Sequence, residues 1–138
     1  MFRQLKKAAG LAAAILATTT MISTAQADAY PEKAITLVVP YGAGGASDLA
    51  GRALAETARS YTDGQPVVVV NKTGNGGMNG ARFVTEQKPD GYTLLLSRVG
   101  MALYPAVYAD SPVGWDDYTF LGILESTPMI LAVNANSD

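Results

Sequence analysis

The sequence predicts an α/β fold in which a mainly parallel sheet is flanked by helices. Three runs of apolar and β-branched residues, at 34–39, 66–71 and 92–97, have the length and composition of buried strands. A segment with helical character separates each run from the next. Strands that alternate with helices form βαβ units, in which the strands are parallel and the crossovers are right-handed.

The first strand is expected at AITLVV, residues 34–39, because nearly all of its side chains are apolar. After a glycine-rich segment, Ser47 is a suitable N-cap for the next helix, because its hydroxyl can accept a backbone hydrogen bond. Asp48 then falls in the first turn, where the helix dipole stabilises a negative charge. Apolar residues continue at helical spacing, namely Leu49, Ala53, Leu54, Ala58 and Tyr61. Asp63-Gly64 ends this helix.

The second and third strands follow the same scheme. PVVVVN (66–71) predicts another buried strand, and KTGNGGMNG (72–80) is a second glycine-rich loop. ARFVTEQK predicts a short helix that Pro89 stops, and Pro89-Asp90-Gly91 is a turn sequence. YTLLLS (92–97) is the third expected strand.

Beyond residue 101 the pattern is less regular. Residues 102–118 predict a short helical turn followed by a loop that proline and glycine punctuate. FLGILES (120–126) and MILAVNA (129–135) predict two further strands. The apolar content of 49% is sufficient for the core of one small domain.

The first 27 residues have the layout of a secretory signal peptide. A basic start with Arg3, Lys6 and Lys7 precedes an apolar run, and Ala25-Gln26-Ala27 supplies the small residues of a cleavage site. The apolar run is shorter than the roughly 20 residues that a membrane span needs. We therefore expect export, cleavage after Ala27, and one mature α/β domain comprising residues 28–138.

Composition excludes several classes of function. Residues 1–27 hold three of the ten basic residues and none of the twelve acidic ones, so the mature chain carries a net charge of −5. No basic run remains in it, which argues against a nucleic-acid partner. The sequence has neither histidine nor cysteine, which removes the usual catalytic triads and the imidazole or thiolate metal sites. No cofactor and no metal is implied.

The two glycine-rich loops are the candidate site. In a parallel sheet the loops 41–47, 72–80 and 97–101 should converge at the carboxyl edge, where ligands of open α/β sheets bind. A dinucleotide fingerprint is only partly matched, because Ser47 replaces the third glycine and Asn71-Lys72 stands where an acid is expected. A phosphate-binding P-loop lacks its Gly-Lys-Ser/Thr. Two tight turns remain an alternative, but two glycine loops at one edge favour a carboxylate cradle of backbone N–H groups and a helix N-terminus.

Four motifs in order carry a family resemblance: ITLVVPYGAGGASD (35–48), GQPVVVVNKTGNGGMNGA (64–81), KPDGYTLLLS (88–97) and WDDYTFLGIL (115–124). They closely resemble the Bug-type receptors, the extracytoplasmic solute-binding proteins of tripartite tricarboxylate transporters. The resemblance implies one lobe of a type II periplasmic-binding-protein-like fold. It also implies a monomeric receptor that closes on a small carboxylate (a di- or tricarboxylate, an acidic amino acid or an aromatic acid) and delivers it to the membrane subunits of a transporter.

The resemblance also implies which residues bind the ligand. In this family the two glycine loops hold one ligand carboxylate, largely through backbone groups and ordered water. By position the implied contacts are Tyr41, Gly44, Gly45, Ser47 and Asp48 in the first loop, Gly74, Gly76, Gly77 and Asn79 in the second, and Ser97 and Arg98 after the third strand. Because a carboxylate would repel the ligand, Asp48 is expected to act at the helix start or through its backbone N–H.

The sequence departs from the family pattern in three respects. Thr73 and Asn75 stand where proline and a small residue are commoner, which is expected to loosen the second loop. Arg98 stands where small or polar residues are commoner, so it is either an exposed loop arginine or a bidentate partner for the ligand carboxylate, which is our hypothesis. Family members are also much longer, so the second lobe is expected to be missing and MILAVNA to be the crossover strand toward it.

Two alternatives to a receptor lobe stay open at this point. The chain is either a working lobe or a non-functional truncated fragment of such a receptor. A secreted α/β hydrolytic enzyme that uses Ser47 and Asp48 is disfavoured, because the chain has no histidine or cysteine to complete the catalytic group.

Overall fold

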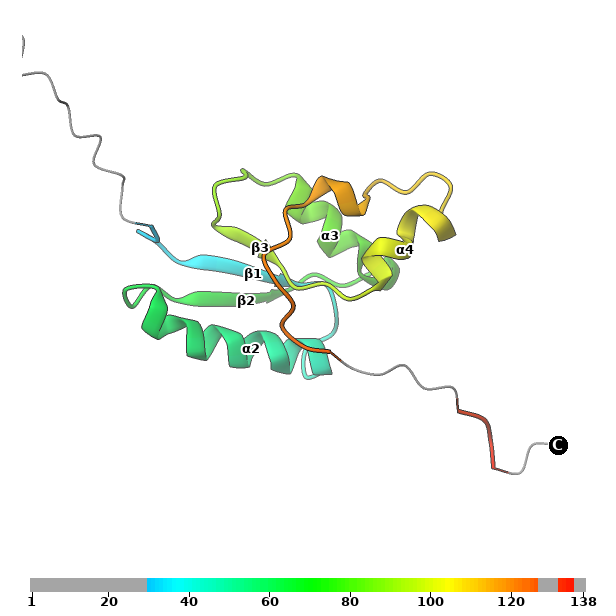
Figure 1. Cartoon of the computed structure of the whole chain (residues 1–138), viewed down its shortest axis with the longest axis horizontal. Helices are drawn as coiled ribbons and strands as arrows, with labels where there is room; N and C mark the ends of the chain where they lie inside the picture. Colours follow the sequence, from blue (N-terminus) through cyan, green and yellow to red (C-terminus); the bar gives the residue numbers. More distant parts are fainter. Residues whose placement is uncertain (1–29, 127–131, 136–138) are drawn as a thin grey trace, which may run out of the picture.

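The computed structural model describes residues 30–126 and 132–135, and its centre is a three-stranded parallel sheet (Figure 1). The strands are β1 (Ile35–Val39), β2 (Val67–Asn71) and β3 (Thr93–Leu95), in the order β2-β1-β3. Both outer strands pair with β1 in parallel, with Ile35 opposite Val67 and Thr36 opposite Thr93. The predicted α/β class with a parallel sheet is therefore confirmed.

The central and outer strands differ in burial. Leu37, Val38 and Val39 of β1 are buried, as expected for a strand with neighbours on both sides. The prediction that the second strand is equally buried is wrong, because β2 is only half-buried and Val68 is 46% exposed. The reason is its place in the sheet, because β2 has one neighbouring strand. Val68 faces the side of α3 (Met78–Thr85), and that helix packs on β3 and β1.

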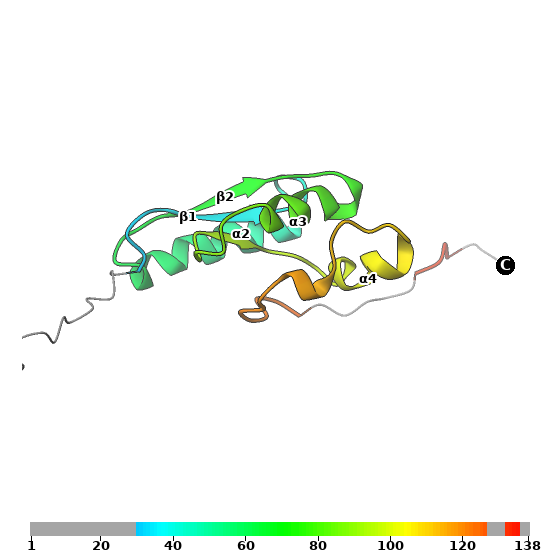
Figure 2. The same ribbon diagram turned by 90° about the horizontal axis from the view of Figure 1, so that it is seen from above.

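Helices cover both faces of the sheet. Figure 1 shows α2 (Ala46–Ala58) on one face, with α3 and α4 (Gly100–Val107) on the other. This arrangement follows from the strand order, because right-handed crossovers to opposite sides of β1 place their helices on opposite faces. Seen from above in Figure 2, α4 lies beyond the end of the sheet. Three short 3₁₀ turns complete the fold: η1 (Arg59–Tyr61), η2 (Asn75–Gly77) and η3 (Trp115–Asp117).

Helix α2 lies over the expected segment, but the apolar residues at helical spacing do not form its buried face. Its buried residues are small or polar, Ser47, Asp48 and Gly51, whereas Leu49 is 60% exposed. The cause is a close approach of helix and sheet: a Cβ on Gly51 would lie 3.1 Å from Cγ2 of Val39. Larger side chains cannot occupy that face, so the leucines of α2 point away from the sheet.

A second cluster of buried residues lies beneath α3 and α4. It comprises Met78, Ala81, Met101, Tyr104 and Val113. Leu95 at the end of β3 and Tyr118 after η3 pack against it. This cluster joins the sheet to the segment after the third strand and so fixes α4 beside the second glycine loop.

The two strands predicted near the end of the chain need correction. Residues 120–126 form no strand, and Ile123 is 90% exposed. A strand needs a neighbour to pair with, and none of the described strands pairs with this segment. Of the segment 129–135, the first three residues lie outside the described ranges, and 132–135 are exposed without strand structure.

The N-terminal segment predicted to be a signal peptide, residues 1–27, also lies outside the described part of the chain. Within the described residues no helix is both long enough and apolar enough to cross a membrane.

Candidate ligand-binding site

The two glycine loops and the segment after β3 meet at the carboxyl edge of the sheet, as predicted. Gly77 of the second loop sits against two tyrosines: a Cβ there would lie 3.2 Å from the ring of Tyr41 in the first loop and 2.9 Å from the hydroxyl oxygen of Tyr104 in α4. Tyr104 also donates a hydrogen bond of 3.0 Å from its hydroxyl to the carbonyl oxygen of Gly76. The three segments therefore form one connected site.

The first loop turns into α2 two residues earlier than predicted. The N-cap is Gly45, and no side chain caps it, so the prediction of Ser47 as N-cap is wrong. The carboxylate of Asp48 instead reaches back along the loop, where Oδ2 accepts a 2.8 Å hydrogen bond from the backbone N–H of Gly44. Gly44 has a φ of 78°, a conformation that favours glycine, and this lets its N–H point at the carboxylate.

Asp48 is the centre of a buried polar network. Its side chain is 2% exposed, and Oδ2 also accepts a 2.9 Å hydrogen bond from Nε of Arg52. Oδ1 accepts a 2.9 Å bond from the amide of Asn71, which in turn donates 3.0 Å to the carbonyl oxygen of Tyr41. Arg52, then the N–H of Gly44 and the amide of Asn71, hold the pKa of Asp48 well below its ordinary value.

Since both Asp48 oxygens accept hydrogen bonds from within the protein, this side chain supports the loop. That agrees with the expected role at the helix start. The first turn of α2 has its own free donors, because the backbone N–H groups of Ala46, Ser47 and Asp48 have no intrahelical acceptor. The preceding residues 42–45 are exposed, so an anion can approach these N–H groups and the positive end of the helix dipole.

The second loop is built from residues with positive φ. The values are 120° for Gly74, 47° for Asn75, 63° for Gly76 and 106° for Gly77. Gly77 donates its N–H to the carbonyl oxygen of Gly74 at 2.9 Å, which closes the turn. Successive backbone N–H groups in a turn can form an anion-binding concavity, and the glycines keep side chains out of it.

Asn79 braces this loop from within. Its Oδ1 accepts a 3.1 Å hydrogen bond from Nδ2 of Asn75, and its Nδ2 donates to the carbonyl oxygen of Thr73 at 3.4 Å. A side chain on Gly74 would collide with this amide. The expectation that Thr73 and Asn75 loosen the loop stays a prediction, although both take part in hydrogen bonds that tie it together.

Arg98 lies at the first loop rather than in open solvent. Its backbone N–H donates to the hydroxyl of Tyr41 at 3.3 Å, and its Nε donates to Oγ of Ser47 at 2.6 Å. Its Nη2 donates 3.2 Å to Oε1 of Glu125. Ser97 is oriented differently, since its hydroxyl donates to the carbonyl oxygen of Arg98 at 3.4 Å.

Besides Tyr104, three residues at this edge were not predicted from the sequence. Asn71 and Arg52 donate hydrogen bonds to Asp48. The sequence features that could have indicated them are a polar residue at the end of a strand, for Asn71, and an arginine four positions after an acid on a helix, for Arg52. Glu125, the partner of Arg98, lies 27 positions along the chain in a segment without regular structure, so no local pattern indicates it.

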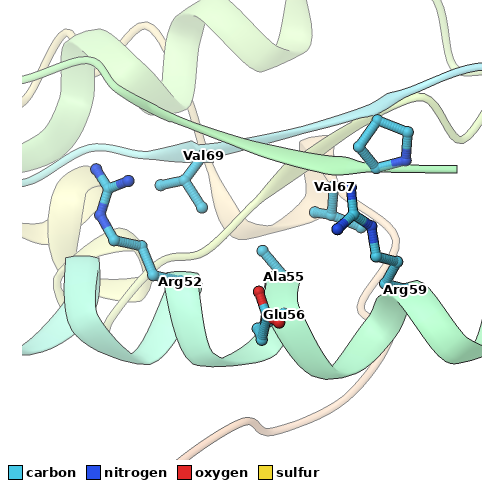
Figure 3. A pocket seen from close by; sticks show the side chains of 7 residues that line it. Arg52, Ala55, Glu56, Arg59, Val67 and Val69 are labelled. Atoms are coloured by element: carbon cyan, nitrogen blue, oxygen red, sulfur yellow. The ribbon is translucent and has the colours of Figure 1, made fainter. Parts of the chain in front are cut away.

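A hollow of about 290 Å³ lies elsewhere, between α2 and β2 (Figure 3). None of the predicted site residues lines it. Its walls are Arg52, Ala55, Glu56, Arg59, Pro66, Val67 and Val69. Among the described residues there is no group of three or more acidic side chains arranged to hold a metal ion.

A parallel α/β lobe with two glycine loops and a helix N-terminus at its carboxyl edge defines a ligand-binding lobe of the kind found in solute-binding proteins. The family model of the tripartite tricarboxylate transporter family receptor, TctC, matches residues 50–138, which is more than half of the chain. The chain belongs to this family, and the resemblance seen in its sequence is confirmed.

Known proteins agree with this assignment. A UPF0065 protein of Agrobacterium vitis is 41% identical over 123 residues, which cover 86% of this chain and 35% of the relative. The structure of the periplasmic binding protein BugD is 43% identical with a TM-score of 0.58, covering 65% of this chain and 29% of BugD. This chain therefore spans about a third of the length of the relatives it matches.

Two further structures contain ligands. MatC of Rhodopseudomonas palustris, with bound malate, has a TM-score of 0.56 and 32% identity, covering 62% of this chain and 29% of MatC. Another R. palustris protein, with adipate, has a TM-score of 0.51 and 33% identity, covering 53% of this chain and 24% of that protein. These neighbours confirm the predicted binding-protein fold class and agree with the expectation that the chain is not an enzyme.

Proposed function

We propose that this chain is the N-terminal lobe of a periplasmic receptor that captures a small carboxylate for the membrane subunits of a tripartite tricarboxylate-type transporter. Residues 1–27 would serve as its signal peptide, with cleavage after Ala27, and residues 28–138 as the lobe. The family match and the malate and adipate in two structural neighbours support a carboxylate ligand. Neither a cofactor nor a nucleic acid enters this function.

The observation that carries the proposal is the meeting of three sources of positive potential at one sheet edge. The first turn of α2 offers free N–H groups, the second loop offers backbone in the positive-φ conformation, and the guanidinium of Arg98 lies 2.6 Å from Ser47 at the start of α2. Hydrogen bonds to a charged acceptor contribute roughly 1.5–3 kcal/mol each, so a few of them suffice for micromolar binding.

The ligand carboxylate would therefore sit between the two loops, with its oxygens on the backbone N–H groups of Ser47 and Gly76 and on the Arg98 guanidinium. Tyr41 and Tyr104 lie beside Gly77 and would form the wall of that position. Of the predicted residues, Asp48 and Asn79 would shape the loops, because their side chains are already bonded within them. Gly44, Gly45, Gly74 and Gly76 would contribute backbone, and Ser97 would set the direction of the segment that carries Arg98.

Calorimetric titration of the purified full chain with malate, adipate and citrate tests this function. Arg98→Ala should weaken binding by about tenfold to a hundredfold, the range of one charge-assisted hydrogen bond. Arg82→Ala is the matched control, since Arg82 is an exposed arginine that pairs with Glu86 on α3. The neutral diamide of malate should not bind, because the donors at this edge require a charged acceptor.

Saturable binding of malate that Arg98→Ala weakens and Arg82→Ala does not would support the proposed site. Equal affinity of both variants would mean that Arg98 is only a loop arginine. No heat with any carboxylate, from a chain that still melts cooperatively, would favour the non-functional fragment. For export, the intact mass of the native protein from a periplasmic extract should correspond to a chain that starts at Asp28.

A further inference from the structure

The guanidinium of Arg98 already holds a carboxylate that belongs to the protein. Its Nη2 pairs with Oε1 of Glu125 at 3.2 Å, while its Nε donates to Ser47 at 2.6 Å. The side chains of Arg98 and Glu125 are 44% and 40% exposed, so the pair sits at the surface of the candidate site. An external carboxylate that reaches Arg98 must compete with this internal one.

The segment that carries Glu125 can move without a large loss of packing. Residues 120–126 form no helix or strand, and Phe120, Leu121 and Ile123 on the same segment are exposed. Little packing is lost when such a segment shifts, because its apolar side chains are not seated in the core. Arg98 is held more firmly, since its backbone N–H and its Nε are both bonded to the first loop.

We propose that Glu125 is an intramolecular stand-in for the ligand: its carboxylate occupies Arg98 in the empty site, and the ligand carboxylate displaces it. This inference rests on the proposed function, because it assigns the competitor at the same site. Exchange of one carboxylate for another keeps the charge on Arg98 balanced in both states. A neutral solute cannot make that exchange, so Glu125 adds selectivity for anions and lowers the apparent affinity.

The size of the effect follows from the fraction of molecules in which Arg98 is free. The apparent dissociation constant rises in inverse proportion to that fraction. For an ion pair as exposed as this one, the bound and free populations differ by up to about fivefold. Paired and free populations between equal and fivefold apart leave one half to one sixth of the molecules with Arg98 free, so removing the Glu125 carboxylate should tighten the binding of malate by about two- to sixfold.

The test is titration of the full chain with malate in five variants. Glu125→Gln removes the charge and keeps the shape, and Glu125→Ala repeats the test with a shorter side chain. Glu86→Gln is the matched control, because Glu86 pairs with Arg82 at 3.0 Å, is also exposed, and lies at the far end of α3 from the loops. The double variant Arg98→Ala/Glu125→Gln, compared with Arg98→Ala alone, isolates the part of the gain that acts through Arg98.

The expected result is tighter malate binding for both Glu125 variants, no change for Glu86→Gln, and no gain from Glu125→Gln once Arg98 is alanine. Unchanged affinity in both Glu125 variants, while Arg98→Ala still weakens binding, overturns the inference and leaves the proposed function standing. A gain of the same size in the Arg98→Ala background also overturns it, because Glu125 would then act by its charge at a distance. No binding of malate, adipate or citrate in any variant refutes both the inference and the function.

Discussion

Replacing Gly80 by alanine tests whether close packing holds the two glycine loops together. Gly80 is in the first turns of α3, directly behind the second loop. A Cβ at this position would lie 2.6 Å from the carbonyl oxygen of Lys72 and 2.7 Å from Cβ of Pro40. Pro40 is fully buried at the end of β1, and Lys72 begins the second loop, so neither neighbour can move without disturbing a loop.

The magnitude comes from two opposing effects. Alanine is the better helix former by about 1 kcal/mol, which favours the variant. Overpacking against backbone and a buried ring costs about 1–3 kcal/mol, and contacts as short as these belong at the upper end of that range. The free energy of unfolding should therefore fall by about 1–2 kcal/mol, and for a domain of this size each kcal/mol lowers the melting temperature by about 4–8 °C.

Urea and thermal unfolding followed by far-ultraviolet circular dichroism would measure this change. Gly122→Ala is the matched control, because nothing lies within 4 Å of a Cβ there and its backbone φ is not positive. Malate affinity should fall in Gly80→Ala as well, since the added methyl group pushes the two loops apart. A Gly80→Ala protein at least as stable as wild type, with Gly122→Ala unchanged, would show that the loops are not held by this contact.

Three further predictions concern the polar groups around the site. Asp48→Asn should reduce the loss of stability that the protein shows between pH 7 and pH 3. Because the pKa of Asp48 is lowered in the fold, its ionised form stabilises the fold above the ordinary pKa of 3.8, and this contribution is lost as the pH falls below that value. Equal pH slopes of the urea midpoint in variant and wild type would contradict the role of Arg52 and Gly44. Tyr104→Phe should lower the free energy of unfolding by roughly 0.5–1.5 kcal/mol, because it removes the hydrogen bond to Gly76, and urea denaturation would detect no change if that bond does not stabilise the loop. Tyr118→Phe should leave the melting temperature unchanged or raise it, because the buried hydroxyl of Tyr118 has no hydrogen-bond partner among the described residues. The same burial raises the pKa of Tyr118 to about 12. A clear drop in melting temperature would mean that the hydroxyl makes a hydrogen bond in solution.

The parallel strands and the meeting of the loops could be predicted because they depend on local patterns. Apolar runs such as 34–39 and 66–71 mark strands, and parallel βαβ geometry then brings the ends of these strands to one edge. The inward face of α2 could not be predicted from apolar spacing, because the distance between helix and sheet is set by Gly51 and Val39 in three dimensions. Small residues faced the sheet, and the leucines did not.

The side-chain network at the site also could not be predicted from the sequence pattern. Asp48 was expected at the helix start, but its acceptance of hydrogen bonds from Gly44, Arg52 and Asn71 depends on two loops folding toward each other. Residues 120–126 read as a strand because apolar residues dominate them, yet a strand exists only where a partner strand lies beside it. The pairing of Arg98 with Glu125 links segments that no local spacing connects.

The order β2-β1-β3 has a consequence for the newly synthesised chain. Ile35 pairs with Val67, which follows it 32 positions later in the chain. The other side of β1 has no partner until β3 has also been synthesised. At translation rates of about 5–20 residues per second, the apolar segment of β1 stays without its first partner for about 2–6 seconds. A parallel strand cannot shorten this wait by forming a hairpin with its neighbour. The most buried strand of the lobe is thus the part that is exposed longest during synthesis, which makes Ile35–Val39 the segment that a chaperone would have to cover.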